Sequence, residues 1–191
     1  PRLSADGKQV VFSGVDKSGF SDLYLLTLAD GEFRRLTHDL YYDIDPDFSS
    51  DGAQIVFASD RCEDGAAGAT NLFSLDIATQ GVARLTYGNY HDRSPDVTSR
   101  GVYFSSDREG TFNIYLLDST GELTTQSTFV TAAFDPRLSP DGKTLVYSGY
   151  QDIQFQAYQM KLPEQPVPLP QVFSSTAESL APLKIDSSHV K

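Results

Sequence analysis

Short apolar segments alternate with turn residues along most of the chain. Four triplets of apolar residues, mostly β-branched or aromatic, each follow a turn that contains glycine: Val10-Val11-Phe12, Ile55-Val56-Phe57, Val102-Tyr103-Phe104 and Leu145-Val146-Tyr147. β-branched and aromatic residues favour strands, and Asp-Gly turns favour tight hairpins because glycine reaches positive φ. The pattern predicts an all-β protein built from short strands.

These segments belong to a repeat that occurs four times. Three of the copies fit Pro-x-φ-Ser-x-Asp-Gly, where φ is apolar, and the copies start at Pro1, Pro46, Pro95 and Pro136. Each copy has a second strand-like segment around an aromatic residue, namely Tyr24, Phe73, Tyr115 and Tyr158. The first three copies then close on Leu-Thr or Gln-Ser. Four short strands in roughly 40 to 50 residues are typical of a β-propeller blade, so we expect four-stranded antiparallel blades.

The third copy tests this strand assignment. It is two residues shorter than the others between Pro95 and Phe104, and its turn is Arg100-Gly101. Side chains alternate between the two faces of a strand, so a two-residue deletion keeps every side chain on its own face. The strand pattern therefore holds in all four copies.

The connections can be sorted by the end of the blade at which they lie. In an up-and-down blade, the loop between the second and third strands lies at the same end as the connection to the next blade. We call this the loop end and the opposite end the turn end; the connections between copies follow Thr37, Thr86 and Ser127. The second copy has four or five extra residues within Cys62–Ala69, which predicts a mobile loop at the loop end. Such insertions often mark a binding face.

Residues 163–191 depart from the repeat. They contain five of the ten prolines and several serines, and Phe173 is their only aromatic residue. Proline is tolerated in linkers and at sheet edges. We therefore divide the chain into propeller blades at 1–162 and a Pro/Ser-rich linker or C-terminal extension at 163–191, in which 167–173 is a candidate edge strand. The pattern shows no clear fourth strand for the last blade.

Composition excludes several classes of function. The formal net charge is −11 with a pI near 4.5, which is unsuited to nucleic-acid binding because that binding depends on cations. The single cysteine, Cys62, excludes an internal disulfide and a multi-thiolate metal site. No apolar run approaches roughly 18 residues, so we expect no direct membrane insertion by this segment. Motifs for serine nucleophiles, zinc hydrolases and phosphate loops are absent, so we expect no catalytic residue, metal or cofactor.

The connections between copies carry the candidate binding residues. Aligned on the repeat proline, Tyr41, Tyr42 and Asp43 match Tyr90, His91 and Asp92. Exposed aromatic residues beside charges are typical interface anchors. The alternative is that the tyrosines pack between blades and the aspartates bond backbone donors.

Acidic and basic residues recur near these connections. Asp60-Arg61 and Asp107-Arg108 follow the apolar triplets of the second and third copies. Arginine presents a fork of donors, so Arg61 and Arg108 either bind a carboxylate of a partner or form hydrogen bonds between blades. The alternation of Asp43-x-Asp45-x-Asp47 places three carboxylates on one face, but the glycine and glutamate of a calcium loop are missing. We therefore expect a solvated or backbone-bonded acidic edge and no metal site.

With Pro-x-φ-Ser-x-Asp-Gly-Lys, Phe-x-Ser-Asp-Arg and Leu-Thr in place, the chain from Pro1 to about Leu162 resembles the TolB-like β-propeller repeat family. The resemblance implies an arc of about four blades from a propeller of six or seven, acting as a non-catalytic protein-interaction module of the bacterial envelope. It implies a periplasmic or otherwise extracytoplasmic location. The implied partner is a protein, either an envelope lipoprotein or an attached outer-membrane barrel.

Two other functions stay open. Similar repeats gate access to the active site in prolyl-oligopeptidase-type and tricorn-type peptidases, so the chain is alternatively a gating propeller whose catalytic domain lies outside it. A purely structural spacer is the third hypothesis. A Gly-x-Ser-x-Gly element elsewhere in the protein would favour the peptidase.

Overall fold

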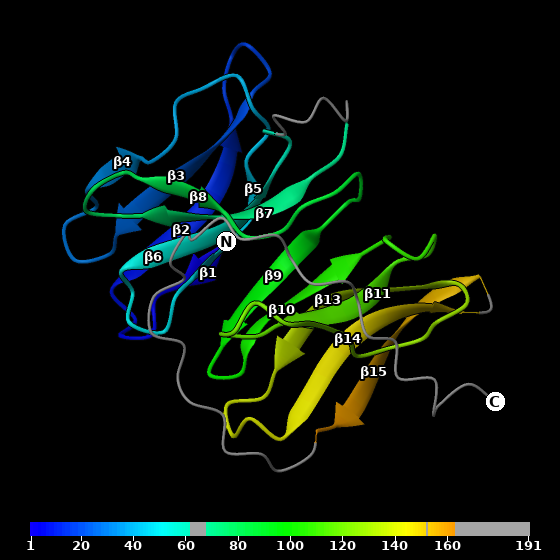
Figure 1. The fold of residues 1–191 in the computed structure, drawn as a ribbon. Coiled ribbons are helices and arrows are strands. Elements are labelled where there is room, and N and C mark those ends of the chain that lie inside the picture. The colour runs from blue at the N-terminus through cyan, green and yellow to red at the C-terminus, as the bar shows by residue number, and fades with distance from the viewer. Residues whose placement is uncertain (62–67, 152, 163–191) are drawn as a thin grey trace.

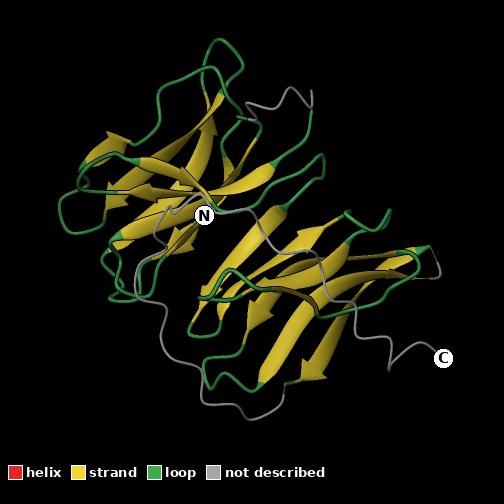
Figure 2. Cartoon of the chain, viewed as in Figure 1, coloured by secondary structure: helices red, strands yellow, loops and turns green. Residues whose placement is uncertain are grey.

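The computed structural model describes residues 1–61, 68–151 and 153–162. This part of the chain consists of strands and loops (Figures 1 and 2). In the same residues, no helix is long and apolar enough to cross a membrane. Most of the predicted mobile loop, including Cys62, and the predicted linker at 163–191 lie outside the described residues.

The strands form antiparallel sheets, one for each copy of the repeat, which we call blades 1 to 4. Blade 1 contains β1 (Arg2–Leu3), β2 (Gln9–Val15), β3 (Ser21–Thr27) and β4 (Phe33–Arg35). Blade 2 contains β5 (Ile44–Phe48), β6 (Gln54–Ser59), β7 (Asn71–Asp76) and β8 (Val82–Arg84). Blade 3 contains β9 (Arg93–Thr98), β10 (Gly101–Ser106), β11 (Asn113–Leu117) and β12 (Leu123–Thr125). Within the described residues, blade 4 contains β13 (Ala132–Leu138), β14 (Thr144–Gln151) and β15 (Gln154–Lys161). The prediction of antiparallel propeller blades is confirmed.

The apolar triplets pair with the aromatic residues of the following strands. In chain order, the cross-strand partners are Phe12 and Tyr24, Phe57 and Phe73, Phe104 and Tyr115, and Tyr147 and Tyr158. Their ring centroids are 5.7 to 6.1 Å apart. Each pair therefore occupies the same position in its blade and stabilises the pairing of the two central strands.

Gly101 explains how the third copy tolerates its shorter turn. It pairs with Thr98 across a two-residue turn and has a φ of 128°. A Cβ at this position would lie 2.2 Å from a backbone oxygen of β11, so only glycine fits. Val97 still pairs with Val102, and the matching residues pair in blade 2. The two-residue deletion therefore keeps the alternation of side chains, as predicted.

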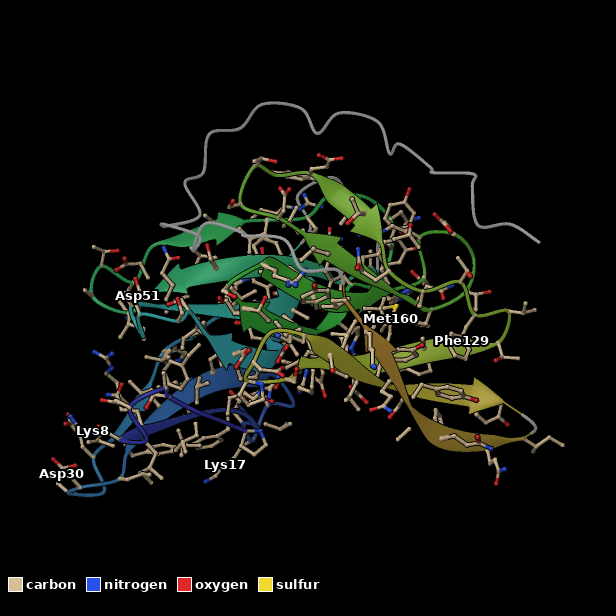
Figure 3. The ribbon with its side chains drawn as sticks, turned by 90° about the horizontal axis from the view of Figure 1, so that it is seen from below. Lys8, Lys17, Asp30, Asp51, Phe129 and Met160 are labelled. Atoms are coloured by element: carbon tan, nitrogen blue, oxygen red, sulfur yellow. The ribbon has the colours of Figure 1, made fainter. Side chains whose placement is uncertain are left out.

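Each Asp-Gly turn at the turn end is stabilised by hydrogen bonds to its aspartate. Asp51 accepts a hydrogen bond from the Ser49 hydroxyl at 2.6 Å and from the Ala53 N–H at 3.0 Å, and blades 1 and 4 repeat the arrangement. These bonds, the Ser49 bond first, lower the pKa of Asp51 because they stabilise its ionised form. The turns that carry Lys8, Asp30 and Asp51 lie on the same side of the molecule in Figure 3.

Apolar residues fill the space between successive blades. Between blades 1 and 2, Leu23 belongs to the same buried cluster as Phe57 and Phe73. The next two interfaces form clusters around the matching aromatic residues of blades 3 and 4. The aromatic pairs of blades 2, 3 and 4 thus pack on the preceding blade, which holds the blades side by side.

The first strands of the blades lie next to one another and are joined by charged residues. The second residue of the repeat motif is charged in each blade: Arg2, Asp47, Asp96 and Arg137. Arg2 lies 3.4 Å from Asp47 and 3.0 Å from Asp96, and Arg137 lies 4.0 Å from Asp96. Each aspartate also accepts a backbone N–H from the first strand of the next blade. The charged position therefore links neighbouring blades.

A bulge at the residue before the repeat proline corrects one expectation. Asp45 has a φ of 53°, and the pairing of β5 with β6 shifts register there. Asp43 therefore bonds Arg61 within blade 2, whereas Asp45 bonds the Ser94 N–H of blade 3 and Asp47 bonds another backbone N–H of blade 3. The prediction that these carboxylates share one face is wrong, because the bulge breaks the strand alternation.

Candidate functional site

The connections between blades meet the loops between second and third strands, as the assignment to the loop end requires. Thr70, just before β7, forms a bridge with His91, just before β9. The N–H of Asp92 donates to the Thr70 carbonyl at 2.7 Å, and the N–H of Asp43 donates to the Ser21 carbonyl at 2.8 Å. Segments 36–43 and 85–92 are therefore anchored to the blade that precedes them.

Large apolar side chains are exposed in these connections. Tyr41 and Tyr42 are each 43% exposed, Leu40 is 75% exposed and Val130 is 92% exposed. The sequence pattern identified the two tyrosines but not Leu40, Val130 or the exposed Tyr87. Counting back from the repeat proline could have found Leu40 and Val130, because they occupy the same position in their connections.

Arg61 holds segment 36–43 in place. Its guanidinium donates to the Asp43 carboxylate at 2.5 Å and lies 3.1 Å from Asp39. The guanidinium also lies over two rings, 5.2 Å from the centroid of Tyr41 and 5.3 Å from that of Phe57. The side chain of Arg61 is 13% exposed and that of Asp43 is fully buried. Arg61 is therefore enclosed between an ion pair and aromatic rings.

Blade 3 repeats the arrangement. Arg108 donates to Asp92 at 2.7 Å and lies 5.3 Å from the centroid of Tyr90 and 5.0 Å from that of Tyr115. The side chain of Arg108 is 9% exposed, and that of Asp92 is fully buried. Each arginine therefore bonds the aspartate at the end of the connection that enters its own blade.

The aspartate before each arginine fixes the backbone of the same connection. Asp60 accepts the N–H of Tyr42 at 2.7 Å. Asp107 accepts the N–H of His91 at 2.7 Å, and its second oxygen lies 2.7 Å from Nδ1 of the His91 ring. Each Asp-Arg dipeptide thus binds two successive residues of the connection, and we call it the Asp-Arg clamp.

Burial changes the pKa of the aspartate that lies beneath the exposed rings. Burial raises the pKa of Asp43, and the bond from Arg61 opposes this rise. Among the described residues, neither Oδ1 of Asp43 nor the buried hydroxyl of Tyr115 has a hydrogen-bond partner. Because a buried charge is costly when it is unpaired, the bond from Arg61 is the main interaction that offsets the burial of Asp43.

The third connection lacks the clamp. Ala132 and Ala133 take the positions of the paired residues in the other connections, and Gln151 takes the place of the arginine. Phe112 and Phe134 fill the junction of blades 3 and 4, with ring centroids 4.9 Å apart. Among the connections that the structure describes, the clamped surface is therefore confined to those that enter blades 2 and 3.

The groups exposed on this surface are of kinds that suit binding. It presents exposed rings and aliphatic side chains on a support of enclosed ion pairs. Within 1–61, 68–151 and 153–162, no group of three or more His, Cys, Asp or Glu residues is arranged to hold a metal ion. Rigid aromatic side chains bury large areas on contact with little loss of rotamer freedom, so the surface suits contact with another protein.

Comparison with known proteins identifies relatives of the chain. It is 34% identical over 151 residues to the Tol-Pal system protein TolB of Francisella tularensis subsp. mediasiatica, an alignment that covers 77% of this chain and 34% of the relative. The chain thus spans about a third of the length of this curated relative.

Solved structures share the fold. TolB from Acinetobacter baumannii matches with a TM-score of 0.71 at 21% identity, covering 84% of this chain and 40% of that one. A putative TolB from Agrobacterium tumefaciens matches with a TM-score of 0.72 at 24% identity, covering 84% and 60%. A puromycin hydrolase matches with a TM-score of 0.67 at 20% identity, covering 84% and 26%. Residues 1–103 match the model of the TolB beta propeller domain, and the chain therefore belongs to the TolB beta propeller family as a TolB-like propeller module.

Proposed function

We propose that this propeller module is a non-catalytic protein-binding unit of the bacterial envelope and that its loop end is the contact surface. The observation that carries the proposal is the gathering of exposed Leu40, Tyr41, Tyr42, Tyr87 and Val130 in the connections at that end. Exposed apolar side chains that gather on one face of a soluble protein mark interaction sites.

The turn end offers a contrast. Its Asp-Gly turns expose polar residues whose carboxylates are occupied by the turn itself, as at Asp51. Large apolar side chains are also exposed at this end, namely Leu28 in the β3–β4 turn and Phe33 and Val82 where β4 and β8 begin. These residues belong to two blades, and the ring of Phe33 stacks on Tyr24. The loop end differs in that Leu40, Tyr41 and Tyr42 are exposed at consecutive positions of one connection, as in the apolar part of an interface.

The predicted site residues take two roles in this proposal. Tyr41, Tyr42, Tyr90 and His91 contact the partner. Asp43, Asp92, Arg61 and Arg108 lie beneath them and fix the shape of the surface. This division follows burial, because a side chain as enclosed as that of Arg61 has little area left to offer a partner.

The partner class follows from charge and from the relatives. A net charge of −11 disfavours nucleic acid. A relative is a protein of the Tol-Pal system. We therefore infer an extracytoplasmic location and a protein partner, for which an envelope lipoprotein and an attached outer-membrane barrel are the two candidates.

Affinity capture with paired variants tests the contact surface. The immobilised protein is compared with Leu40→Ala/Tyr42→Ala, which removes exposed groups from the loop end, and with Leu28→Ala, which removes an exposed group from the turn end. Envelope proteins retained by the wild type should be lost at least tenfold with the loop-end variant, because interface anchors contribute about 2 kcal/mol or more each. They should be retained by Leu28→Ala. Equal retention by all three proteins would contradict the proposal.

The peptidase alternative has one specific observation in its favour, the shared fold with puromycin hydrolase. In that case the blades would filter substrates for a catalytic domain elsewhere in the protein. Labelling of the protein with a fluorophosphonate probe, which reacts with activated serine nucleophiles, distinguishes the two functions. Our proposal predicts no labelling above that of a heat-denatured control, and specific labelling would support the peptidase.

A further inference from the structure

The two Asp-Arg clamps differ in one respect that bears on the partner. In blade 3, both oxygens of the Asp107 carboxylate are engaged by His91, one by its N–H and one by its ring. The matching residue in blade 2 is Tyr42, whose N–H alone reaches Asp60. Among the described residues, Tyr42 is the one donor to the exposed Asp60 carboxylate, so its second oxygen remains available at the surface.

Arg61, the arginine beneath the surface of blade 2, is already paired with carboxylates other than Asp60. Arg61 pairs with Asp39 and Asp43 and points its guanidinium between the rings beneath the surface. Asp39 and Asp43 therefore share one arginine, and none of the ion pairs among the described residues reaches Asp60. In blade 3 the position of Asp39 is Gly88, so that clamp has one acidic residue fewer at this place.

The connection whose backbone binds Asp60 carries groups that suit an arginine side chain. Tyr42, whose N–H binds Asp60, is 43% exposed, and so is the adjacent Tyr41. Tyrosine rings attract guanidinium groups and pack on their aliphatic stems, while a carboxylate accepts their forked N–H groups. Leu40, beside them in the chain, offers further apolar contact.

We propose that Asp60, Tyr41 and Tyr42 form a receptor for an arginine side chain on an extended segment of the protein partner. In blade 3, the ring of His91 occupies the equivalent place on Asp107 from within the same chain. The net charge of −11 favours a partner segment with positive charge and speeds its encounter with the surface. The inference rests on the proposed function, because it names the chemistry of the partner at the same loop end.

Peptide binding tests this receptor directly. The probe is a synthetic nonapeptide of Gly and Ser with a central Leu-Arg-Leu, compared with the same peptide in which citrulline, a neutral isostere, replaces arginine. Binding to the full protein is followed through the backbone amide signals of Tyr42 and Asp60 by NMR titration. We expect the arginine peptide to bind about tenfold more tightly than the citrulline peptide, and more weakly at high salt.

Two matched variants locate the contact. Asp60→Asn keeps an acceptor for the Tyr42 N–H but removes the charge, so the arginine peptide should lose about tenfold in affinity and bind like the citrulline peptide. Asp107→Asn makes the same change at the carboxylate that His91 fills, so the peptide should bind as to the wild type. Equal binding of the two peptides, absence of binding, or equal losses in the two variants would each overturn the receptor.

Affinity capture separates this inference from the proposed function. Loss of the envelope partner with both Leu40→Ala/Tyr42→Ala and Asp60→Asn supports both. Loss with the double variant and full retention by Asp60→Asn would overturn the arginine receptor and leave the contact surface standing. Retention by both variants would overturn both.

Discussion

At the scale of single residues, the loop end depends on arginines that lie under the surface. Arg61 and Arg108 each join a buried aspartate to aromatic rings from two strands and one connection. A guanidinium suits this place because it stacks on rings with its faces and donates to carboxylates with its edge. The rings of Tyr41 and Tyr90 therefore each pack on an arginine side chain that solvent barely reaches.

Removing one member of this ion pair should destabilise the fold. Arg61→Gln leaves the buried Asp43 carboxylate without its cation, which should lower the free energy of unfolding by about 3 kcal/mol in urea denaturation. Arg34→Gln is the matched control, because Arg34 lies on the outer strand β4 and is exposed. Asp43→Asn added to Arg61→Gln should recover part of the loss, since it removes the uncompensated charge. Equal stability of the two arginine variants would contradict the role of the clamp.

At the scale of elements, the repeat motif has a physical function at each of its polar positions. The serine and aspartate close the turn, as Ser49 and Asp51 show. The glycine after them takes a positive φ of 70° at Gly52. The closing threonine binds the third strand, because the Thr37 hydroxyl accepts the Leu23 N–H at 2.9 Å, and blades 2 and 3 repeat this bond. The motif therefore recurs because each blade needs the same turn and the same strand closure.

The turn aspartates should make stability depend on pH in the acid range. The pKa of Asp51 is lowered from 3.8 in the fold, so its contribution is fully present above about 3.8 and is lost as the pH falls through the lowered value. Asp51→Asn should therefore reduce stability at pH 7 and have a smaller effect at pH 2.5, as measured by urea denaturation at the two pH values. Ser50→Ala, in the same turn, serves as the control. An equal loss at both pH values would show that the ionised carboxylate has no part in the effect.

At the scale of the whole molecule, the repeat made the architecture predictable, whereas the site was predictable only in part. Period, turn chemistry and aromatic spacing identified the blades, because every blade must bury the same face against its neighbour. The repeat aligned Asp43 with Asp92 and Arg61 with Arg108. The ion pair that each arginine forms with its aspartate could not be predicted in the same way, because it depends on how two loops fold towards each other. The positive φ of Asp45 has no such signal in the sequence, which is why the expectation that Asp43, Asp45 and Asp47 share one face was wrong.

We propose above all that the loop end of these blades is the surface that meets a protein partner. Hydrogen–deuterium exchange of the protein, alone and in complex with the partner recovered by affinity capture, tests this most directly. The amides of 38–42 and 87–91 should exchange more slowly in the complex, and those of the turns at 49–53 and 118–122 should be unchanged. Slower exchange confined to the turns, with the two connections unaffected, would contradict the claim.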